Sequence, residues 1–339
     1  MKSVPIIGIT MGDPAGIGPE VVLKALTHRE TAEACRCVVY GSIGVMQEAA
    51  KLIGWDGRII QLEHAASAEA EGHTLQVISC GEEHPYPKGE VSRQCGELAF
   101  QAVNRAAADA MGGIVEAVST APLNKESLRR AGYPWNGHTE LFAELTGTEQ
   151  YAMMLVEGNL RVVHVSTHVS LKQAISLVRT KRIVSVIRLV HDALCDMGIP
   201  SPRIAVAGLN PHAGEGGLFG EEEIREIIPA VKETADLGAS GPYPPDTVFS
   251  RTMGGEFDAA AAMYHDQGHI ALKTAGFKYE RGGKVSISGV NITLGLPIIR
   301  TSADHGTAFD RAWKGTADER SMLSAVLSAA EMVKNRRSR

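Results

Sequence analysis

Short apolar runs alternate along the chain with longer stretches in which apolar and polar residues are mixed. The apolar runs have the length of buried strands and lie at 4–10, 36–40 and 74–79. The mixed stretches predict helices that begin at Pro19 and span 42–53 and 92–110. This repeated order of strand and helix predicts a mainly parallel sheet with helices on both faces.

The rest of the chain keeps this order with one interruption. Residues 153–156 and 161–166 are two apolar runs separated by Glu157-Gly158-Asn159, which predicts a hairpin. The other expected elements are strands at 114–120 and 203–207, helices ending near 131 and spanning 180–197, 221–237 and 318–339, and a Gly- and Pro-rich loop at 239–245. Because no clear linker or repeat occurs, we expect domains that share the sheet or that the chain enters more than once.

Length and composition limit both architecture and function. The chain has 339 residues, of which 44% are hydrophobic and only 5% aromatic, so we expect two domains with aliphatic cores. A formal charge of -5 gives no general attraction for nucleic acid or an anionic membrane, and any anion must be bound by a local cluster. We therefore expect a small-molecule ligand and no nucleic-acid partner.

The cysteines and the N-terminal residues indicate the compartment. Five cysteines without a CxxC pair are typical of reduced thiols, and we assign them neither zinc nor a disulfide. The N-terminal apolar run is far shorter than a signal-peptide core, and no stretch approaches the roughly 18 apolar residues of a membrane span. We expect a cytoplasmic protein without a membrane segment.

Three histidines, His168, His212 and His265, lie at the ends of predicted strands or in the turns directly after them. Open α/β sheets bind ligands at these ends because the loops there converge on one crevice. Three neutral imidazoles leave coordination positions open, as in a catalytic metal site, although each could instead be structural. Asp246 and Asp266 could orient these imidazoles or cap helices.

Other polar residues indicate anion binding. Gly137-His138-Thr139-Glu140 precedes a predicted helix with Thr139 as its N-cap, and the free amide groups of such a helix start bind phosphate or carboxylate. Lys273, Asn291 and Arg300 lie among apolar residues and need an anionic partner, either a structural carboxylate or a substrate.

The standard nucleotide and hydrolase motifs are absent. The sequence has no GxGxxG after a predicted strand, no GxxxxGK[ST], no HExxH and no GxSxG, so any dinucleotide binds outside the usual fingerprint. Residues 305–307 instead begin another predicted helix, with Ser302 or Asp304 as its cap.

Five segments share their residues with one enzyme family. They are MGDPAGIGPE at 11–20, GHTE at 137–140, LNPHAGE at 209–215, YHDQG at 264–268 and residues 291–306. Together they resemble the 4-hydroxythreonine-4-phosphate dehydrogenase (PdxA-like) family, in order from about residue 6 to 315. The resemblance implies the isocitrate and isopropylmalate dehydrogenase fold, with two α/β/α domains and a cleft between them. It implies a first, dinucleotide-side domain of residues 1–122 and 292–339, a second domain of residues 123–291 on the metal and dimer side, and a homodimer.

The resemblance also assigns roles to individual residues. It implies a divalent metal on His168, His212 and His265, without defining zinc, cobalt, nickel, manganese or magnesium. It implies substrate binding by His138, Thr139, Lys273, Asn291 and Arg300. For NAD, with NADP left open, it implies Gly295, Asp304, His305, Gly306, Thr307 and Asp310.

Two features bear on the branch of the family. The connection at 274–290 is longer and more charged than the family pattern, which leaves the substrate open. Gly268-His269 and residues 161–170 resemble the branch that acts on 4-phospho-D-threonate or 4-phospho-D-erythronate more than the vitamin B6 enzyme.

The expected reaction is an NAD-dependent, metal-assisted oxidative decarboxylation of one of these acids or of 4-hydroxy-L-threonine 4-phosphate. Asp246, Asp266 and Lys273 are the candidate catalytic residues. The alternatives are an NAD-dependent dehydrogenase of a cyclic dihydrodiol dicarboxylate, a metal-dependent lyase or hydrolase without NAD, and a non-catalytic sensor of phosphorylated sugar acids.

Overall fold

The computed structural model describes residues 4–69, 73–82, 85–276, 278–279, 285–286 and 288–339. The chain divides into two compact units, Met1–Glu149 with Leu296–Arg339, and Gln150–Gly295. These limits differ from the expected limits after residues 122 and 291. Two helices, α5 (Lys125–Arg130) and α6 (His138–Leu145), pack on α4 (Arg93–Met111) and so belong to the first unit.

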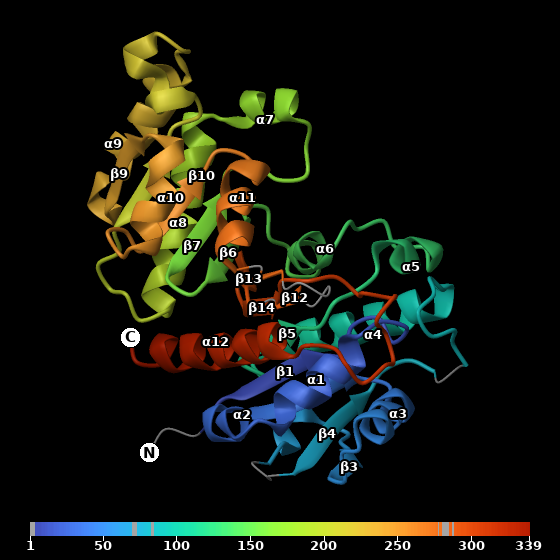
Figure 1. Ribbon diagram of the computed structural model, residues 1–339. Coiled ribbons are helices and arrows are strands. Elements are labelled where there is room, and N and C mark those ends of the chain that lie inside the picture. The colour runs from blue at the N-terminus through green and yellow to red at the C-terminus, as the bar shows by residue number, and fades with distance from the viewer. Residues whose placement is uncertain (1–3, 70–72, 83–84, 277, 280–284, 287) are drawn as a thin grey trace. The chain divides into compact units, whose positions relative to one another are not determined.

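The first unit contains a six-stranded parallel sheet in the order β3-β4-β2-β1-β5-β14 (Figure 1). Its strands are β1 (Ile6–Thr10), β2 (Arg36–Gly41), β3 (Arg58–Gln61), β4 (Thr74–Ser79), β5 (Ala117–Thr120) and β14 (Ile299–Ala303). β1 and β5 are buried along their whole length, as expected for strands covered on both faces.

Helices cover both faces of this sheet. One layer holds α1 (Gly18–Thr27), α2 (Arg29–Ala34), α3 (Ile43–Ile53) and α12 (Arg320–Arg336), and α4 packs on β1, β2 and β5 from the opposite side. Serine starts two of the helices, because Ser42 Oγ accepts from Val45 N and Ser92 Oγ from Cys95 N, both at 3.1 Å. A short 3-10 turn spans Ala65–Ser67.

The second unit contains six strands in the order β13-β6-β7-β10-β8-β9. They are β6 (Ala152–Glu157), β7 (Leu160–His164), β8 (Ile204–Ala207), β9 (Ala239–Tyr243), β10 (Ala259–Ala262) and β13 (Val290–Leu294). β6 runs antiparallel to β7 and β13, which confirms the predicted hairpin, and the remaining pairs are parallel. The expected mainly parallel α/β architecture is therefore confirmed.

Helices also cover both faces of the second sheet. They are α7 (Leu171–Leu177), α8 (Thr180–Asp196), α9 (Ile228–Glu233), α10 (Pro245–Met253) and α11 (His265–Gly276). α10 and α11 close an aliphatic core in which Val162, Ala260 and Leu272 take part with Phe249. The shorter elements are 3-10 turns at Pro211–Gly217 and Ala235–Leu237, a π turn at Glu223–Ile227, and the pair β11 (Lys278–Tyr279) and β12 (Val285–Ser286). In the described parts, no helix is both long and apolar enough to cross a bilayer.

Three predicted elements are wrong. Residues 239–245 are not all loop, because β9 pairs with β8 alone; on such an edge, Pro242 need not donate a ladder hydrogen bond. The helix at 221–237 is divided into a π turn, α9 and a 3-10 turn, and Pro229 stands in the first turn of α9. Residues 304–319 form turns and irregular chain instead of a helix from His305.

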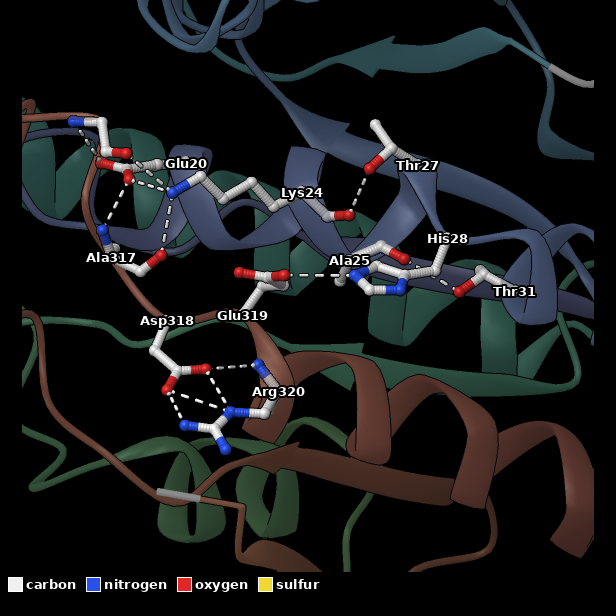
Figure 2. Close-up of polar contacts among 11 residues, drawn as sticks. Glu20, Lys24, Ala25, Thr27, His28, Thr31, Ala317, Asp318, Glu319 and Arg320 are labelled. Carbon is white, nitrogen blue, oxygen red and sulfur yellow. Dashed lines mark hydrogen bonds and ion pairs between the residues drawn. The ribbon is translucent and has the colours of Figure 1, made fainter. Parts of the chain in front are cut away.

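The irregular segment is held to α1 by an ion pair between buried Glu20 and half-buried Lys24 (Figure 2). Glu20 is only 2% exposed, and its carboxylate accepts from Lys24 Nζ at 2.7 Å and from Ala317 N at 2.7 Å. The ammonium of Lys24 also donates to the carbonyls of Gly315 at 3.0 Å and Ala317 at 2.9 Å. Each partner thus fills its remaining hydrogen-bonding positions with the backbone of the segment, which offsets the cost of burying the two charges.

Two further contacts extend this attachment. His28 Nε2 lies 3.1 Å from Glu319 Oε1, and Asp318 binds Arg320 at the start of α12 (Figure 2). Upstream, Ile17 N donates to Thr307 O at 3.0 Å, so the glycine-rich turn after β1 also contacts the segment. The N-terminal and C-terminal parts of the first unit are therefore joined around α1.

A substitution at Gly96 would test how closely α4 and α5 pack in the first unit. A Cβ at this position of α4 would lie 2.0 Å from the carbonyl oxygen of Ser127 in α5, so Gly96→Ala must push the two helices apart. We expect it to lower the free energy of unfolding by about 3 kcal/mol in urea denaturation.

The matched control is Gly112→Ala at the end of the same helix, where the nearest atom would be 3.4 Å away and φ is -78°. It should change the free energy of unfolding by less than about 1 kcal/mol. Equal losses for the two variants would contradict the packing described for α4 and α5.

Candidate active site

The three expected metal ligands follow adjacent strands of the second unit. β7, β10 and β8 are neighbours, and His168, His265 and His212 come after their respective carboxyl ends. His168 and His265 lie together, with ring centroids 5.5 Å apart. Two of the three imidazoles therefore lie near each other after neighbouring strands.

His212 takes a different place. Its ring lies 6.3 Å from that of Phe219, and no three His, Cys, Asp or Glu side chains gather as a metal site anywhere in the described residues. His168 and His212 nevertheless share a strained backbone, with φ of 52° and 53°. Such left-handed geometry in residues other than glycine costs of order 1 kcal/mol and is concentrated at functional sites.

The two candidate carboxylates differ in their surroundings. Asp266 Oδ1 lies 2.6 Å from His265 Nδ1, which fixes the imidazole ring and leaves its Nε2 as the other available nitrogen. Asp246 is exposed in the first turn of α10. The geometry thus gives Asp266 an orienting contact with a predicted ligand and gives Asp246 none.

Two histidines beside this pair had no role assigned from the sequence. His269 stacks on His265 with ring centroids 3.7 Å apart, and its Nδ1 lies 3.1 Å from His164 Nε2. Burial lowers the pKa of His164 to about 3 and that of His269 to about 4, with neighbouring histidines adding to the effect. The spacing of His265 and His269 by four residues on one helix was the available indication.

A buried cation marks the first unit. Arg300 is 2% exposed on β14; its Nη2 donates to Thr120 Oγ1 at 2.6 Å, and its guanidinium lies 5.7 Å from the ring centre of Phe142. Burial lowers the pKa of Arg300 to about 9, against the raising effect of Glu140, so the side chain stays charged at neutral pH. A desolvated charge of this kind favours a bound anion.

His138 stands next to this cation at the start of α6. Burial, and then the charge of Arg300, lower the pKa of His138 well below its usual range, so the ring is neutral at pH 7. Its Nε2 is buried and has no hydrogen-bond partner among the described residues. Gly137, not Thr139, is the N-cap of α6; Thr139 lies within the first turn, so its predicted capping role is wrong.

The two remaining substrate candidates belong to the second unit. Asn291 lies on β13, and its Oδ1 is buried without a hydrogen-bond partner in the part of the chain that the structure describes. Lys273 lies in the last turn of α11. The connection at 274–290, which was expected to affect the substrate, falls partly outside the described residues.

The segment expected to hold the dinucleotide contacts the glycine-rich turn after β1. Thr307 O accepts from Ile17 N, and a Cβ on Gly16 would lie 2.8 Å from the same carbonyl oxygen. Asp304 N donates to Ser321 Oγ at 2.9 Å, and His305 Nδ1 lies 3.1 Å from Gly306 O. Asp310 is exposed, whereas Gly295 closes the turn after β13, where a Cβ would meet Gln150 O at 2.3 Å.

The glycine-rich turn after β1 also holds a buried carboxyl group to which the sequence alone assigns no role. Asp13 is fully buried, and its Oδ1 accepts from Ala15 N at 2.9 Å. Burial raises the pKa of Asp13 to about 6, and the hydrogen bond from Ala15 N only partly opposes this. A charge kept in so costly a position is typical of functional turns.

Solved structures share this fold along nearly the whole chain. A 4-hydroxythreonine-4-phosphate dehydrogenase from Klebsiella pneumoniae has a TM-score of 0.84 and 44% identity, covering 97% of this chain and 99% of that one. A terephthalate 1,2-cis-dihydrodiol dehydrogenase from Burkholderia xenovorans has a TM-score of 0.68 and 26% identity, covering 96% and 98%. The fold is therefore that of a class of two-unit α/β dehydrogenases.

The sequence comparisons define the family within this class. The family model described as pyridoxal phosphate biosynthetic protein PdxA matches residues 33–329, and the chain belongs to this family. A D-threonate 4-phosphate dehydrogenase from Cupriavidus necator is 44% identical over 98% of both chains. A 4-hydroxythreonine-4-phosphate dehydrogenase from Desulfosudis oleivorans is 44% identical over 96% of this chain and 95% of its own. The predicted family is confirmed, and the chain is an oxidoreductase.

Asp13 yields a prediction about pH. Its native pKa exceeds the ordinary value of 3.8, so its contribution to stability is complete below that value and is lost as the pH rises through about 6. Asp13→Asn, which resembles the protonated form, should raise the free energy of unfolding at pH 8 by up to about 3 kcal/mol. This gain in the free energy of unfolding, measured by urea titration, should vanish near pH 4.

Asp109→Asn is the control, because buried Asp109 already accepts from Tyr40 at 2.8 Å and pairs with Arg105 at 3.3 Å. It should bring no gain at pH 8. A gain from Asp13→Asn that is the same at pH 4 and pH 8 would show that ionisation is not its cause.

Proposed function

We propose that the chain is an NAD-dependent, divalent-metal-dependent dehydrogenase that oxidises and decarboxylates a 4-phosphorylated hydroxy acid. The candidates are 4-phospho-D-threonate, 4-phospho-D-erythronate and 4-hydroxy-L-threonine 4-phosphate. The observation that carries the proposal is 44% identity along the whole chain to a D-threonate 4-phosphate dehydrogenase. The buried cation at Arg300 supports a substrate with negative groups.

The residues that we propose to bind the substrate are His138, Thr139, Lys273, Asn291 and Arg300. Arg300 would provide charge-assisted hydrogen bonds to the phosphate or the carboxylate. The neutral ring of His138 and the amide of Asn291 would orient the ligand, because each has a buried polar atom without a protein partner among the described residues.

NAD would bind the first unit at Asp304, His305, Gly306, Thr307 and Asp310, with Gly295 shaping the preceding turn. The close contact of Thr307 with the turn at Gly16 supports this, because it keeps backbone groups of both segments within one small region. A hydride from C3 of the substrate would pass to NAD. The hydroxyl proton would pass to Asp246, Asp266 or Lys273, and carbon dioxide would leave from the resulting 3-keto acid.

A divalent ion would be held by His168, His212 and His265, and when bound it would polarise the oxygen atoms of the substrate. Imidazoles suit several divalent metals, and Asp266 already orients His265. Within this chain His168 and His265 lie together, but the three histidines do not gather as one cluster among the described residues. The site therefore requires movement of the turn at Pro211–Gly217 or a histidine from a second copy of the chain.

A homodimer is part of the proposal. Most of the large apolar side chains that are exposed belong to the second unit, where a subunit interface would remove them from water. They include Leu171 at 59%, Leu218 at 72%, Phe219 at 48%, Ile224 at 49% and Ile270 at 65% exposure. Phe219 contacts His212, so an interface on this surface would lie beside one of the proposed ligands.

The second candidate is the dehydrogenation of a cyclic dihydrodiol dicarboxylate. It is favoured by the likeness to the terephthalate dihydrodiol dehydrogenase at a TM-score of 0.68. We rank this reaction second because the identity to that enzyme is 26%, against 44% to the D-threonate 4-phosphate dehydrogenase.

Reduction of NAD by a panel of substrates tests the function. We expect turnover of at least one of the three phosphorylated acids, and at least about a hundredfold lower kcat/KM for D-threonate without phosphate, because the charged contact is lost. A metal chelator should abolish turnover, and His212→Ala should lower kcat/KM about a hundredfold.

His191→Ala is the matched control, since His191 lies on α8 of the same unit and pairs with Asp192. It should keep wild-type activity. Near wild-type turnover by His212→Ala in the presence of chelator would exclude the metal, and turnover of the dihydrodiol alone would favour the second candidate.

Light scattering during gel filtration tests the homodimer. The wild-type protein should have twice the mass of one chain, and Leu218→Glu should shift it towards the monomer, because a charge would be buried in the interface. Met111→Glu, at an apolar residue of the first unit that is 49% exposed, should remain dimeric. A wild-type monomer at all concentrations would refute the assembly.

A further inference from the structure

Two cysteines lie face to face where α2 is followed by β2. Cys35 and Cys37 flank Arg36 in extended chain, so their side chains project to the same side. Their sulfur atoms are 3.4 Å apart, and Cys35 Sγ also lies 3.6 Å from Thr31 O. Both thiols are reduced in this structure. Formation of a bond requires rotation of both side chains and a local bend of the chain at Arg36, because a disulfide needs its Cβ atoms closer together than an extended chain places them.

The pair lines a cavity of about 310 Å³ in the first unit. Cys35 is 3% exposed, whereas Cys37 is half-buried. The wall also carries the cationic side chains of Arg29 and Arg36 together with Glu69. Figure 2 shows His28 and Thr31, which belong to the same wall. None of these residues takes part in the proposed reaction, so the cavity is separate from the site described above.

The thiol pair has the electrostatics of a reactive dithiol. The hydrogen bond from Cys37 lowers the pKa of Cys35, and the ammonium of Lys334 on α12 acts in the same direction. The same hydrogen bond, followed by burial, raises the pKa of Cys37. Cys35 is therefore the more acidic of the two thiols, and the more acidic thiol more readily supplies the thiolate that attacks a disulfide.

We propose that Cys35 and Cys37 form a reversible dithiol and disulfide couple that is oxidised by small disulfides entering this cavity. One cysteine thiolate attacks a sulfur of the small disulfide, its S–S bond breaks, and one small thiol leaves. The second cysteine then attacks the mixed disulfide, which forms the Cys35–Cys37 bond and releases the second small thiol. The two cysteines lose two electrons, and their two protons are carried by the two thiols that leave.

The ring closed by this bond spans only three residues. Such a short loop constrains the unfolded chain little, so the bond gains little from loop closure. A disulfide of this kind is readily reduced, which makes the couple reversible. Arg29 and Arg36 favour an anionic oxidant, and glutathione disulfide is the probe that we would use.

Trypsin offers a direct readout, because Arg36 lies between the two cysteines. The native protein is incubated with glutathione disulfide, its free thiols are alkylated, and it is then digested. We expect peptides 30–36 and 37–51 to remain joined and to be lighter by two hydrogens than the pair of reduced peptides. Dithiothreitol added before alkylation should return the two peptides as separate alkylated species.

Serine variants provide the controls, since serine nearly preserves the shape of cysteine. Cys35→Ser and Cys37→Ser should yield no joined peptide, and Cys195→Ser should still yield it, with unchanged circular dichroism for all three. Recovery of the two wild-type peptides as separate alkylated species after oxidation would overturn the proposal. A glutathione adduct that persists on either wild-type cysteine would overturn it as well.

Discussion

The largely buried ion pair of Glu20 and Lys24 is the interaction on which the first unit depends. A buried pair is stable only if its other hydrogen-bonding positions are also filled, and here the backbone of Gly315 and Ala317 fills them. The irregular segment before α12 has no secondary structure of its own to define its path. The path of this segment, Thr307 included, therefore depends on its contacts with α1 and with the turn before α1. The proposed dinucleotide-binding residues lie on the same segment, so their position depends on the same contacts.

The two units supply different chemistry. The first holds a desolvated guanidinium, Arg300, beside a neutral imidazole, which suits an anionic ligand. The second holds the neutral imidazoles of His164 and His269, and His168 and His212 there have an unfavourable backbone conformation. Strain at the two histidines and the buried charge of Arg300 both lower stability, so their presence is better explained by binding than by folding. Membership of the PdxA family is consistent with this division.

Elements that depend on residues close together in the sequence could be predicted from the sequence alone. Ser42 and Ser92 start helices, and the hairpin around Gly158 is evident from its two apolar runs. The wrong assignments have tertiary causes: Pro242 is tolerated because β9 has one neighbour, and no helix forms after His305 because the backbone there bonds to α1 and α12. The family motifs identified His168 and His265, which the fold brings together. His164 and Asp13 were missed because their importance comes from burial, which no single sequence shows.

The central claim is that His168, His212 and His265 bind one ion, whichever copies of the chain supply them. Two of these rings lie together here, and the third contacts Phe219. The most direct measurement is the anomalous scattering of crystals grown with zinc or manganese. The account predicts one strong peak per chain, coordinated by one copy of each of the three imidazoles. A peak at other residues would contradict it. So would a fully occupied metal site at which His212 does not coordinate the ion.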